Sequence, residues 1–151
     1  MKRVFLFGLL AVVVLSCDKD SFETRPQLEF KKASTDIVPL NSALEVELSY
    51  TDKEGDLDSV FVVRHRLNKK NPGVVLPVLN FGIPPDFKND TKGDIVLTLF
   101  YQTHLIVNMT PISIPGTGGK LEPDTVNMRF VLLDKEKNSS DTVNKVFVII
   151  R

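Results

Sequence analysis

The stretch LEVELSY, residues 44–50, alternates strictly between apolar and polar side chains. In an extended chain, Leu44, Val46, Leu48 and Tyr50 fall on one face, and the two glutamates and the serine fall on the other. A period of two indicates a β-strand with one face in a core and the other in water. This stretch therefore predicts a sheet that is covered on one side only.

Further runs rich in Val, Ile, Phe and Tyr predict more strands, at residues 28–32, 60–67, 74–81, 95–101, 105–107, 126–133 and 143–150. Turns containing Gly, Pro, Asn or Asp separate these runs, and no sustained helical period follows Cys17. Seven or eight short strands separated in this way predict an all-β fold, an antiparallel β-sandwich. The loops 82–93 and 110–124 are its least regular parts.

The C-terminal stretch VNMRFVLLDKEKNSSDTVNKVFVIIR, residues 126–151, resembles the last hairpin of immunoglobulin-like domains. In that class a strand ends in an acidic residue and the chain returns after an Asn-Ser turn. Residues 50–57 resemble the turn after the second strand of the same class. The resemblance implies one immunoglobulin-like domain over residues 26–151. The chain has no Trp and a single Cys, which excludes an antibody-type domain.

The N-terminus has the pattern of a secretory signal peptide. Lys2 and Arg3 precede an apolar run at residues 4–15, which as a helix would span only about 18 Å. A bilayer core is about 30 Å thick, so the run is too short for a comfortable span. Small Ser16 stands at the cleavage position, and the pattern predicts a cleaved signal peptide at residues 1–16.

The tetrapeptide Val14-Leu15-Ser16-Cys17 resembles the lipobox of bacterial lipoproteins, although Val14 and Leu15 depart from the commonest residues. The resemblance implies cleavage before Cys17, a diacylglycerol on its sulfur and an acylated amino group. Cys17 is the only cysteine, so it has no partner for a disulfide within the chain. Two alternatives stay open: a plain signal peptide with an incidental cysteine, and an uncleaved anchor.

Residues 17–25 are predicted to be the lipidated cysteine and a polar linker. Their Cys-Asp-Lys-Asp start resembles lipoproteins of the Bacteroidota, in which acidic and lysine residues after the cysteine direct export to the outer face of the cell. The resemblance implies a cell-envelope protein held at the outer membrane by a lipid anchor, on either face. In enteric bacteria, by contrast, an Asp directly after the lipidated cysteine retains a lipoprotein in the inner membrane. That rule would place this protein in the inner membrane instead.

Composition excludes several functions. Basic and acidic residues balance at 19 each and form no basic stripe, so no nucleic-acid partner is expected. The chain has two histidines, His65 and His104, on or beside different predicted strands. A zinc site usually needs three or four protein ligands, so these two histidines do not supply one. No Gly-x-Ser-x-Gly motif and no cysteine–histidine pair supplies a nucleophile. We therefore expect a protein that is not an enzyme. We expect no cofactor, apart from the candidate calcium ion discussed below.

Two acidic turns form a candidate calcium site. In an immunoglobulin-like sandwich the loop after the second strand and the loop in the last hairpin lie at the same end. Calcium takes six to eight oxygen ligands, and these loops offer Asp52, Glu54, Asp56, Asp58, Asp134, Glu136 and Asn138. Ordinary solvated turns explain the same residues. The alternative functions are a carboxylate-dependent envelope hydrolase and a calcium-stabilised adhesion domain.

Two further groups of residues are candidate sites. Asp-Ser/Thr-Val triplets with Ser59, Thr125 and Thr142 resemble the short O-glycosylation motif of the Bacteroidota, although they also suit strand edges. Phe81 and Phe87, in and beside the loop 82–93, are candidate ligand contacts. Together these patterns predict a lipid-anchored, non-catalytic binding or structural module whose loops contact an envelope protein or a glycan.

Overall fold

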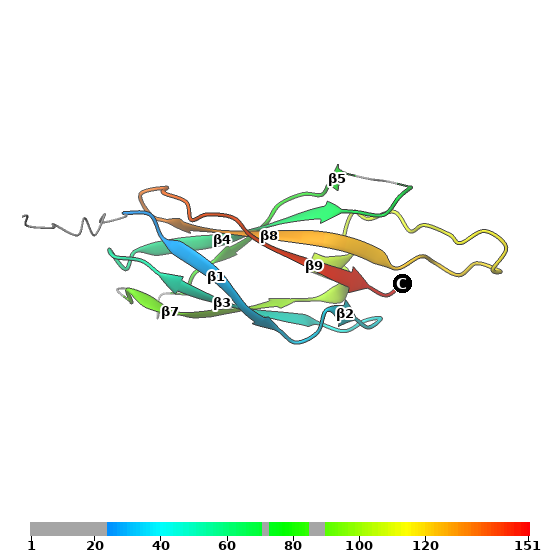
Figure 1. Cartoon of the computed structure of the whole chain (residues 1–151), viewed down its shortest axis with the longest axis horizontal. Helices are drawn as coiled ribbons and strands as arrows, with labels where there is room; N and C mark the ends of the chain where they lie inside the picture. The colour runs from blue at the N-terminus through cyan, green and yellow to red at the C-terminus, as the bar shows by residue number, and fades with distance from the viewer. Residues whose placement is uncertain (1–23, 71–72, 85–89) are drawn as a thin grey trace, which may run out of the picture.

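The computed structural model describes residues 24–70, 73–84 and 90–151, and these form a two-layer, nearly all-β domain (Figure 1). The predicted signal peptide, Cys17 and Phe87 lie outside the described residues. Within the described part, no helix is long and apolar enough to cross a membrane.

The first layer is a three-stranded sheet in the order β1-β3-β7. It contains β1 (Gln27–Ala33), β3 (Leu44–Thr51) and β7 (Lys92–Leu99), all antiparallel to their neighbours. The LEVELSY stretch is its central strand, with four alternate side chains buried as predicted.

The second layer is a larger sheet in the order β2-β9-β8-β4-β5. Its strands are β2 (Ile37–Val38), β9 (Val143–Ile149), β8 (Asp124–Asp134), β4 (Leu57–Arg66) and β5 (Val74–Val75), and β6 (Leu79–Gly82) pairs with β4 beside β5. All pairs are antiparallel except β2 with β9, which is parallel. The neighbours β1-β3-β7 and β9-β8-β4 occupy the places of strands A-B-E and G-F-C in an immunoglobulin-like sandwich.

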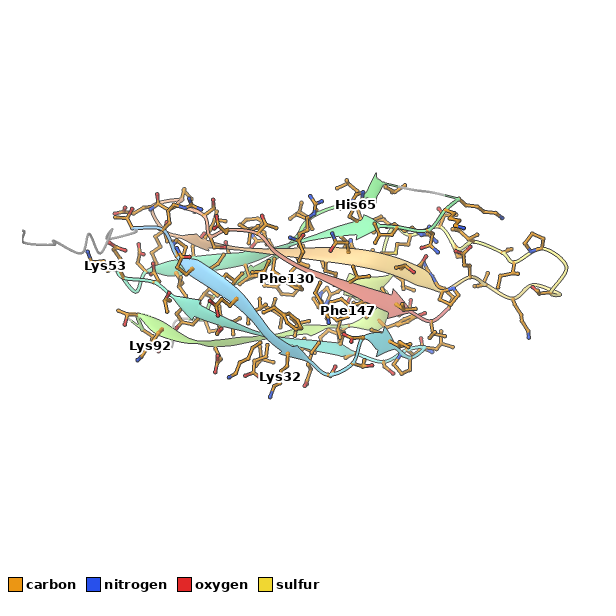
Figure 2. The ribbon with its side chains drawn as sticks, in the orientation of Figure 1. Lys32, Lys53, His65, Lys92, Phe130 and Phe147 are labelled. Carbon is orange, nitrogen blue, oxygen red and sulfur yellow. The ribbon has the colours of Figure 1, made fainter. Side chains whose placement is uncertain are left out.

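The core lies between the two layers and follows the period of two in each strand. β8 contributes Val126, Met128, Phe130 and Leu132, all with no exposed surface. Phe147 of β9 is also fully buried and lies opposite Val126 in the β8–β9 pair (Figure 2). Burying each phenylalanine stabilises the fold by about 1.5–3 kcal/mol.

Two of the predicted strands differ in the structure. Residues 74–81 form β5 and β6 rather than one strand, because Pro77 between them has no N–H for a ladder hydrogen bond. Residues 105–107 were predicted as a strand, but the chain forms one π-helical turn at Tyr101–Leu105. The Tyr101 hydroxyl donates a hydrogen bond to the Ile150 carbonyl at 2.5 Å, which fixes this turn against the end of β9.

Candidate functional site

Three aspartates from distant parts of the chain meet at one end of the sandwich. Asp52 follows β3, Asp56 precedes β4, and Asp134 ends β8, where it lies opposite Leu57. One carboxylate oxygen from each lies within 4.8 Å of the other two. The sequence prediction that the two acidic turns lie at the same end is therefore correct. We call Asp52, Asp56 and Asp134 the acidic triad.

Backbone hydrogen bonds hold the acidic triad in place. The Asp52 Oδ2 accepts the N–H of Asp56 at 2.9 Å, across a turn in which Gly55 has a positive φ of 65°. Asp134 accepts the backbone N–H and the side-chain Nδ2–H of Asn138, each at 2.8 Å. The N–H of Lys135 donates to the Asp56 carbonyl at 3.0 Å, which joins the two turns.

The acidic triad is unusually buried for carboxylates. Asp52 and Asp134 are each 2% exposed, and Asp56 is half-buried. The Oδ1 atoms of Asp52 and Asp56 are buried and have no hydrogen-bond partner within the described part of the chain. Burial raises the pKa of Asp52, the Asp56 N–H lowers it, and the nearby carboxylates raise it again. The acidic triad therefore brings three carboxyl groups together without pairing all of their oxygens.

The other four residues of the predicted calcium set lie outside the acidic triad. Asp58 accepts hydrogen bonds from Lys137 at 3.0 Å and from Ser59 at 3.3 Å, and Lys137 holds the pKa of Asp58 below its usual value. Glu54 and Glu136 are exposed. Asn138 directs its amide nitrogen toward Asp134, so it supports a carboxylate rather than offering an oxygen.

Phe81 lines a groove between the open edges of the two sheets. The groove has a volume of about 190 Å³, and residues 81–84 and 95–98 line it. The Phe81 ring meets His104 edge to face, with centroids 5.3 Å apart. The His104 Nδ1 accepts the Phe100 N–H at 3.0 Å, which holds the imidazole beside Phe81. Phe81 is thus placed for ligand contact, and that role stays a prediction.

The three predicted glycosylation acceptors differ in accessibility. Thr142 is exposed just before β9, Thr125 is half-buried in β8, and Ser59 is 4% exposed in β4. An enzyme that transfers a sugar would reach Ser59 only after β4 opened locally. The geometry therefore favours Thr142 among the three.

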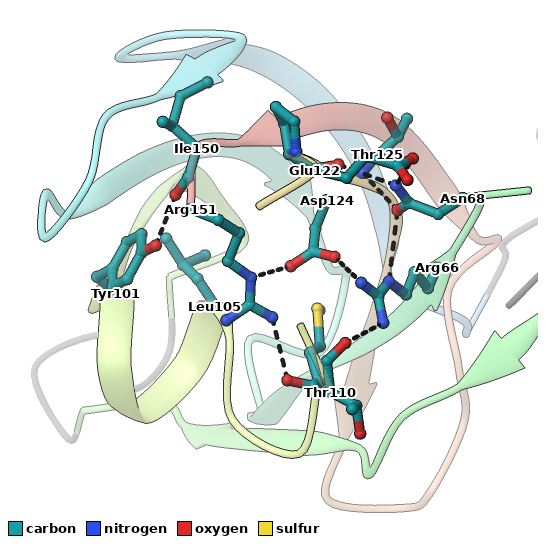
Figure 3. Close-up of polar contacts among 12 residues, drawn as sticks. Arg66, Asn68, Tyr101, Leu105, Thr110, Glu122, Asp124, Thr125, Ile150 and Arg151 are labelled. Atoms are coloured by element: carbon teal, nitrogen blue, oxygen red, sulfur yellow. Dashed lines mark hydrogen bonds and ion pairs between the residues drawn. The ribbon is translucent and has the colours of Figure 1, made fainter. Parts of the chain in front are cut away.

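A buried ion cluster at the opposite end of the sandwich was not predicted from the sequence. Asp124, at the start of β8, has no exposed surface and pairs with both Arg66 and Arg151 (Figure 3). Arg66 also donates to the Thr110 carbonyl at 2.7 Å, and Arg151 donates to the Met109 carbonyl at 3.1 Å. The cluster therefore holds β4, β8, the end of the chain and the loop after the π-helical turn together.

Arg64 is a second buried cation that the sequence did not predict. It has no exposed surface, and its guanidinium donates to the carbonyls of His104, Leu105, Val107 and Pro77 at 2.6–3.3 Å. Burial lowers the pKa of Arg64. The signal was present in the sequence, because Arg64 and Arg66 continue the buried phase of Val60 and Val62 in β4.

The polar contacts around the ion cluster extend to neighbouring amides. Asn68 donates to the Glu122 carboxylate at 2.6 Å and to the Pro123 carbonyl at 2.9 Å. Its own side-chain oxygen accepts the Thr125 N–H at 3.0 Å. These contacts fasten the loop that leads into β8, and they give this end of the molecule a structural role.

Comparison with known proteins gives distant structural neighbours. No protein-family model matches the chain, and no curated protein matches it. The alkylpurine DNA glycosylase AlkC of Pseudomonas fluorescens, bound to DNA containing an abasic site analog, is similar at 7% identity and a TM-score of 0.47, over 85% of this chain and 31% of that one. The sporulation control protein Spo0M of Bacillus subtilis is similar at 9% identity and a TM-score of 0.46, over 84% and 50%.

A Niemann-Pick type C2 protein from the Japanese carpenter ant is also similar, at 11% identity and a TM-score of 0.44, over 82% of this chain and 92% of that chain. The chain spans about a third of the glycosylase and half of the sporulation protein. These three proteins differ in function, and at such low scores the likeness carries no functional argument.

Proposed function

We propose that this protein is a lipid-anchored component of the cell envelope whose β-sandwich is a non-catalytic binding or structural module. The observation that carries the proposal is the run of Lys2, Arg3 and a short apolar stretch that ends at Ser16-Cys17. A leader too short to span a bilayer, followed by the only thiol of the chain, suits acylation of that thiol. Outer-membrane attachment is part of the proposal.

The direction in which the chain enters the domain supports this function. Arg25 donates hydrogen bonds to the Ser139 carbonyl at 3.0 Å and to Asp141 at 2.8 Å, so the described chain starts beside the β8–β9 turn. The residues between Cys17 and Thr24 would reach at most about 25 Å when extended. A lipid on Cys17 would thus keep the end with the acidic triad near the membrane.

The opposite end of the domain carries a projecting arm, the loop at residues 110–123 (Figure 1). Ser113 and Leu121 form an isolated antiparallel bridge within it, and the Ile114 N–H donates to the Lys120 carbonyl at 2.9 Å. Residues 113–120 are all exposed. A membrane anchor at the other end would present this arm to a partner, which we propose to be an envelope protein or a glycan.

The non-catalytic part of the proposal rests on where the buried carboxylates lie. The grooves formed by the described residues include one at residues 32–34 with 45, 47 and 96, one at residues 27 and 29 with 49–51, and the Phe81 site. The acidic triad lines none of these three. A hydrolase needs carboxyl groups that reach a bound substrate, so the geometry favours a module that binds or supports.

Membrane fractionation tests the anchor. The Cys17→Ala protein is expected in the soluble fraction, whereas a Ser21→Ala control in the same linker stays with the membrane. Mass spectrometry of the native protein should show an N-terminal cysteine with acyl chains. A Cys17→Ala protein that stays in the membrane, or a native protein with an unmodified thiol or an intact leader, would contradict the proposal.

A further inference from the structure

We propose that the acidic triad is a binding site for a calcium ion that ties the β3–β4 turn to the end of β8. The site uses Asp52, Asp56 and Asp134 and needs no lipid anchor. Its function is distinct from the binding role proposed above, because the ion would stabilise the end of the sandwich that faces the tether.

The spacing of the oxygens fits such an ion. Calcium–oxygen distances are 2.3–2.6 Å, so two ligands of one ion lie at most about 4.6–5.2 Å apart. One oxygen from each of Asp52, Asp56 and Asp134 lies within 4.8 Å of the others. The three carboxylates can therefore surround a single ion with little movement of the backbone.

The unsatisfied oxygens are the second, independent observation. The Asp52 side chain is 98% buried, yet its Oδ1 has no hydrogen-bond partner within residues 24–70, 73–84 and 90–151. The Oδ1 of Asp56 is buried and unpartnered in the same way. Buried polar groups are nearly always paired, and each exception calls for an unseen water or ion. Two unpaired oxygens beside a third carboxylate favour a cation over water.

The chemistry of the donors selects the class of ion. The three side chains offer only carboxylate oxygens, which suit hard cations such as calcium and magnesium rather than zinc or copper. The hydrogen bonds from Asn138 to both Asp134 oxygens leave lone pairs on each oxygen and fix the orientation of the carboxylate. Half-buried Asp56 leaves a path for water to complete the coordination shell. Calcium accepts a flexible arrangement of oxygens, whereas magnesium demands near-ideal octahedral geometry, so these three side chains suit calcium better.

The neighbouring acidic residues provide a matched control. Asp58 lies two residues after Asp56 and is engaged by Lys137 at 3.0 Å. Asp52→Asn retains an oxygen that can accept the Asp56 N–H, so the turn should form in this variant. Asp58→Asn removes the same charge from the same region and leaves the acidic triad intact.

The test compares melting of the purified full-length protein in detergent with chelator, with calcium and with magnesium. Calcium at about 100 times its Kd should raise the wild-type midpoint by about 10 °C. The rise should persist in Asp58→Asn and disappear in Asp52→Asn. In chelator, Asp52→Asn should melt no lower than the wild type, since the substitution removes repulsion among carboxylates. Calorimetric titration should give one calcium per wild-type chain.

Several results would overturn the proposal. Equal wild-type midpoints in chelator and calcium would show that the carboxylates share protons rather than an ion. A calcium response that survives in Asp52→Asn would place the binding elsewhere. A larger rise in the melting midpoint with magnesium than with calcium would contradict the assignment of the site to calcium. A Cys17→Ala protein that stays in the membrane would leave this site unaffected, so the two proposals fail separately.

Discussion

The buried ion cluster at Asp124 should be the most sensitive charged group in the fold. Asp124→Leu removes the only carboxylate that pairs with Arg66 and Arg151 within the described residues, and both guanidiniums stay buried. Their side chains are 3% and 6% exposed, so water cannot replace the lost partner. Removing one member of a buried pair costs about 3–5 kcal/mol, because the remaining charge is left uncompensated.

Urea unfolding followed by circular dichroism measures this loss. For a domain of this size the slope m is about 1.5 kcal/mol per M, so the midpoint should fall by about 2–3 M. A control at the exposed pair Arg25–Asp141, whose side chains are 51% and 89% exposed, should change little. Exposed ion pairs contribute about 0–1 kcal/mol, and Asp141→Asn should therefore move the midpoint by less than about 0.7 M.

A triple substitution separates charge from shape. Arg66→Met, Asp124→Leu and Arg151→Met together replace the whole cluster by apolar side chains of similar size. Apolar replacement of a complete buried ion cluster is often neutral or stabilising, so the triple variant should recover most of the stability that Asp124→Leu loses. The reasoning would be refuted if Asp124→Leu moved the midpoint by less than about 0.5 M, or if the triple variant were less stable than the single one.

Three other results are expected. Arg64→Leu should lower the free energy of unfolding by about 2–4 kcal/mol because it leaves buried carbonyls unpaired, whereas Arg129→Leu, on the exposed face of β8, should change urea stability by less than about 0.5 kcal/mol. The contact from Lys31 at 2.7 Å, with a further one from Lys32, holds the pKa of Glu47 below its usual value. This contribution to stability is present at neutral pH and is lost as pH falls through the folded-state pKa. An NMR titration should therefore show the pKa of Glu47 rising in Lys31→Met. Thr142→Ala should remove a glycan from the native protein as judged by intact mass, and an unchanged mass would exclude that acceptor.

Much of the fold could be predicted because the period of two is a local signal. The apolar phase of LEVELSY identified β3 and its buried face, and the phase of residues 126–132 did the same for β8. The π-helical turn at residues 101–105 could not be found in this way. It depends on contacts with residues far along the chain, such as the Tyr101 hydroxyl on Ile150 and the Arg64 guanidinium on the carbonyls of the turn.

The acidic triad could be predicted only in outline. The two acidic turns were expected at the same end because immunoglobulin-like connectivity places them there. The carboxylates that point inward are those at buried positions in the alternation of each strand. Asp52 lies two residues after buried Tyr50, and Asp134 lies two residues after buried Leu132. Asp58 has the opposite phase from Leu57 and is held by Lys137. Counting side chains with an oxygen ligand gave seven candidates, six of them acidic, whereas the alternation of buried and exposed positions separates Asp52 and Asp134 from Asp58 correctly.

A comparison of the two buried aspartates at the ends of β8 supports an ion at the acidic triad. Both Asp124 and Asp134 are in the buried phase of the strand, and each is at most 2% exposed. At Asp124 the chain supplies Arg66 and Arg151, so a buried negative charge is met by two positive ones. Asp134 has hydrogen bonds from Asn138 and two further carboxylates nearby. Because buried charges persist only when they are paired or bound to metal, the balance that arginines provide at one end of the strand would come from a divalent cation at the other.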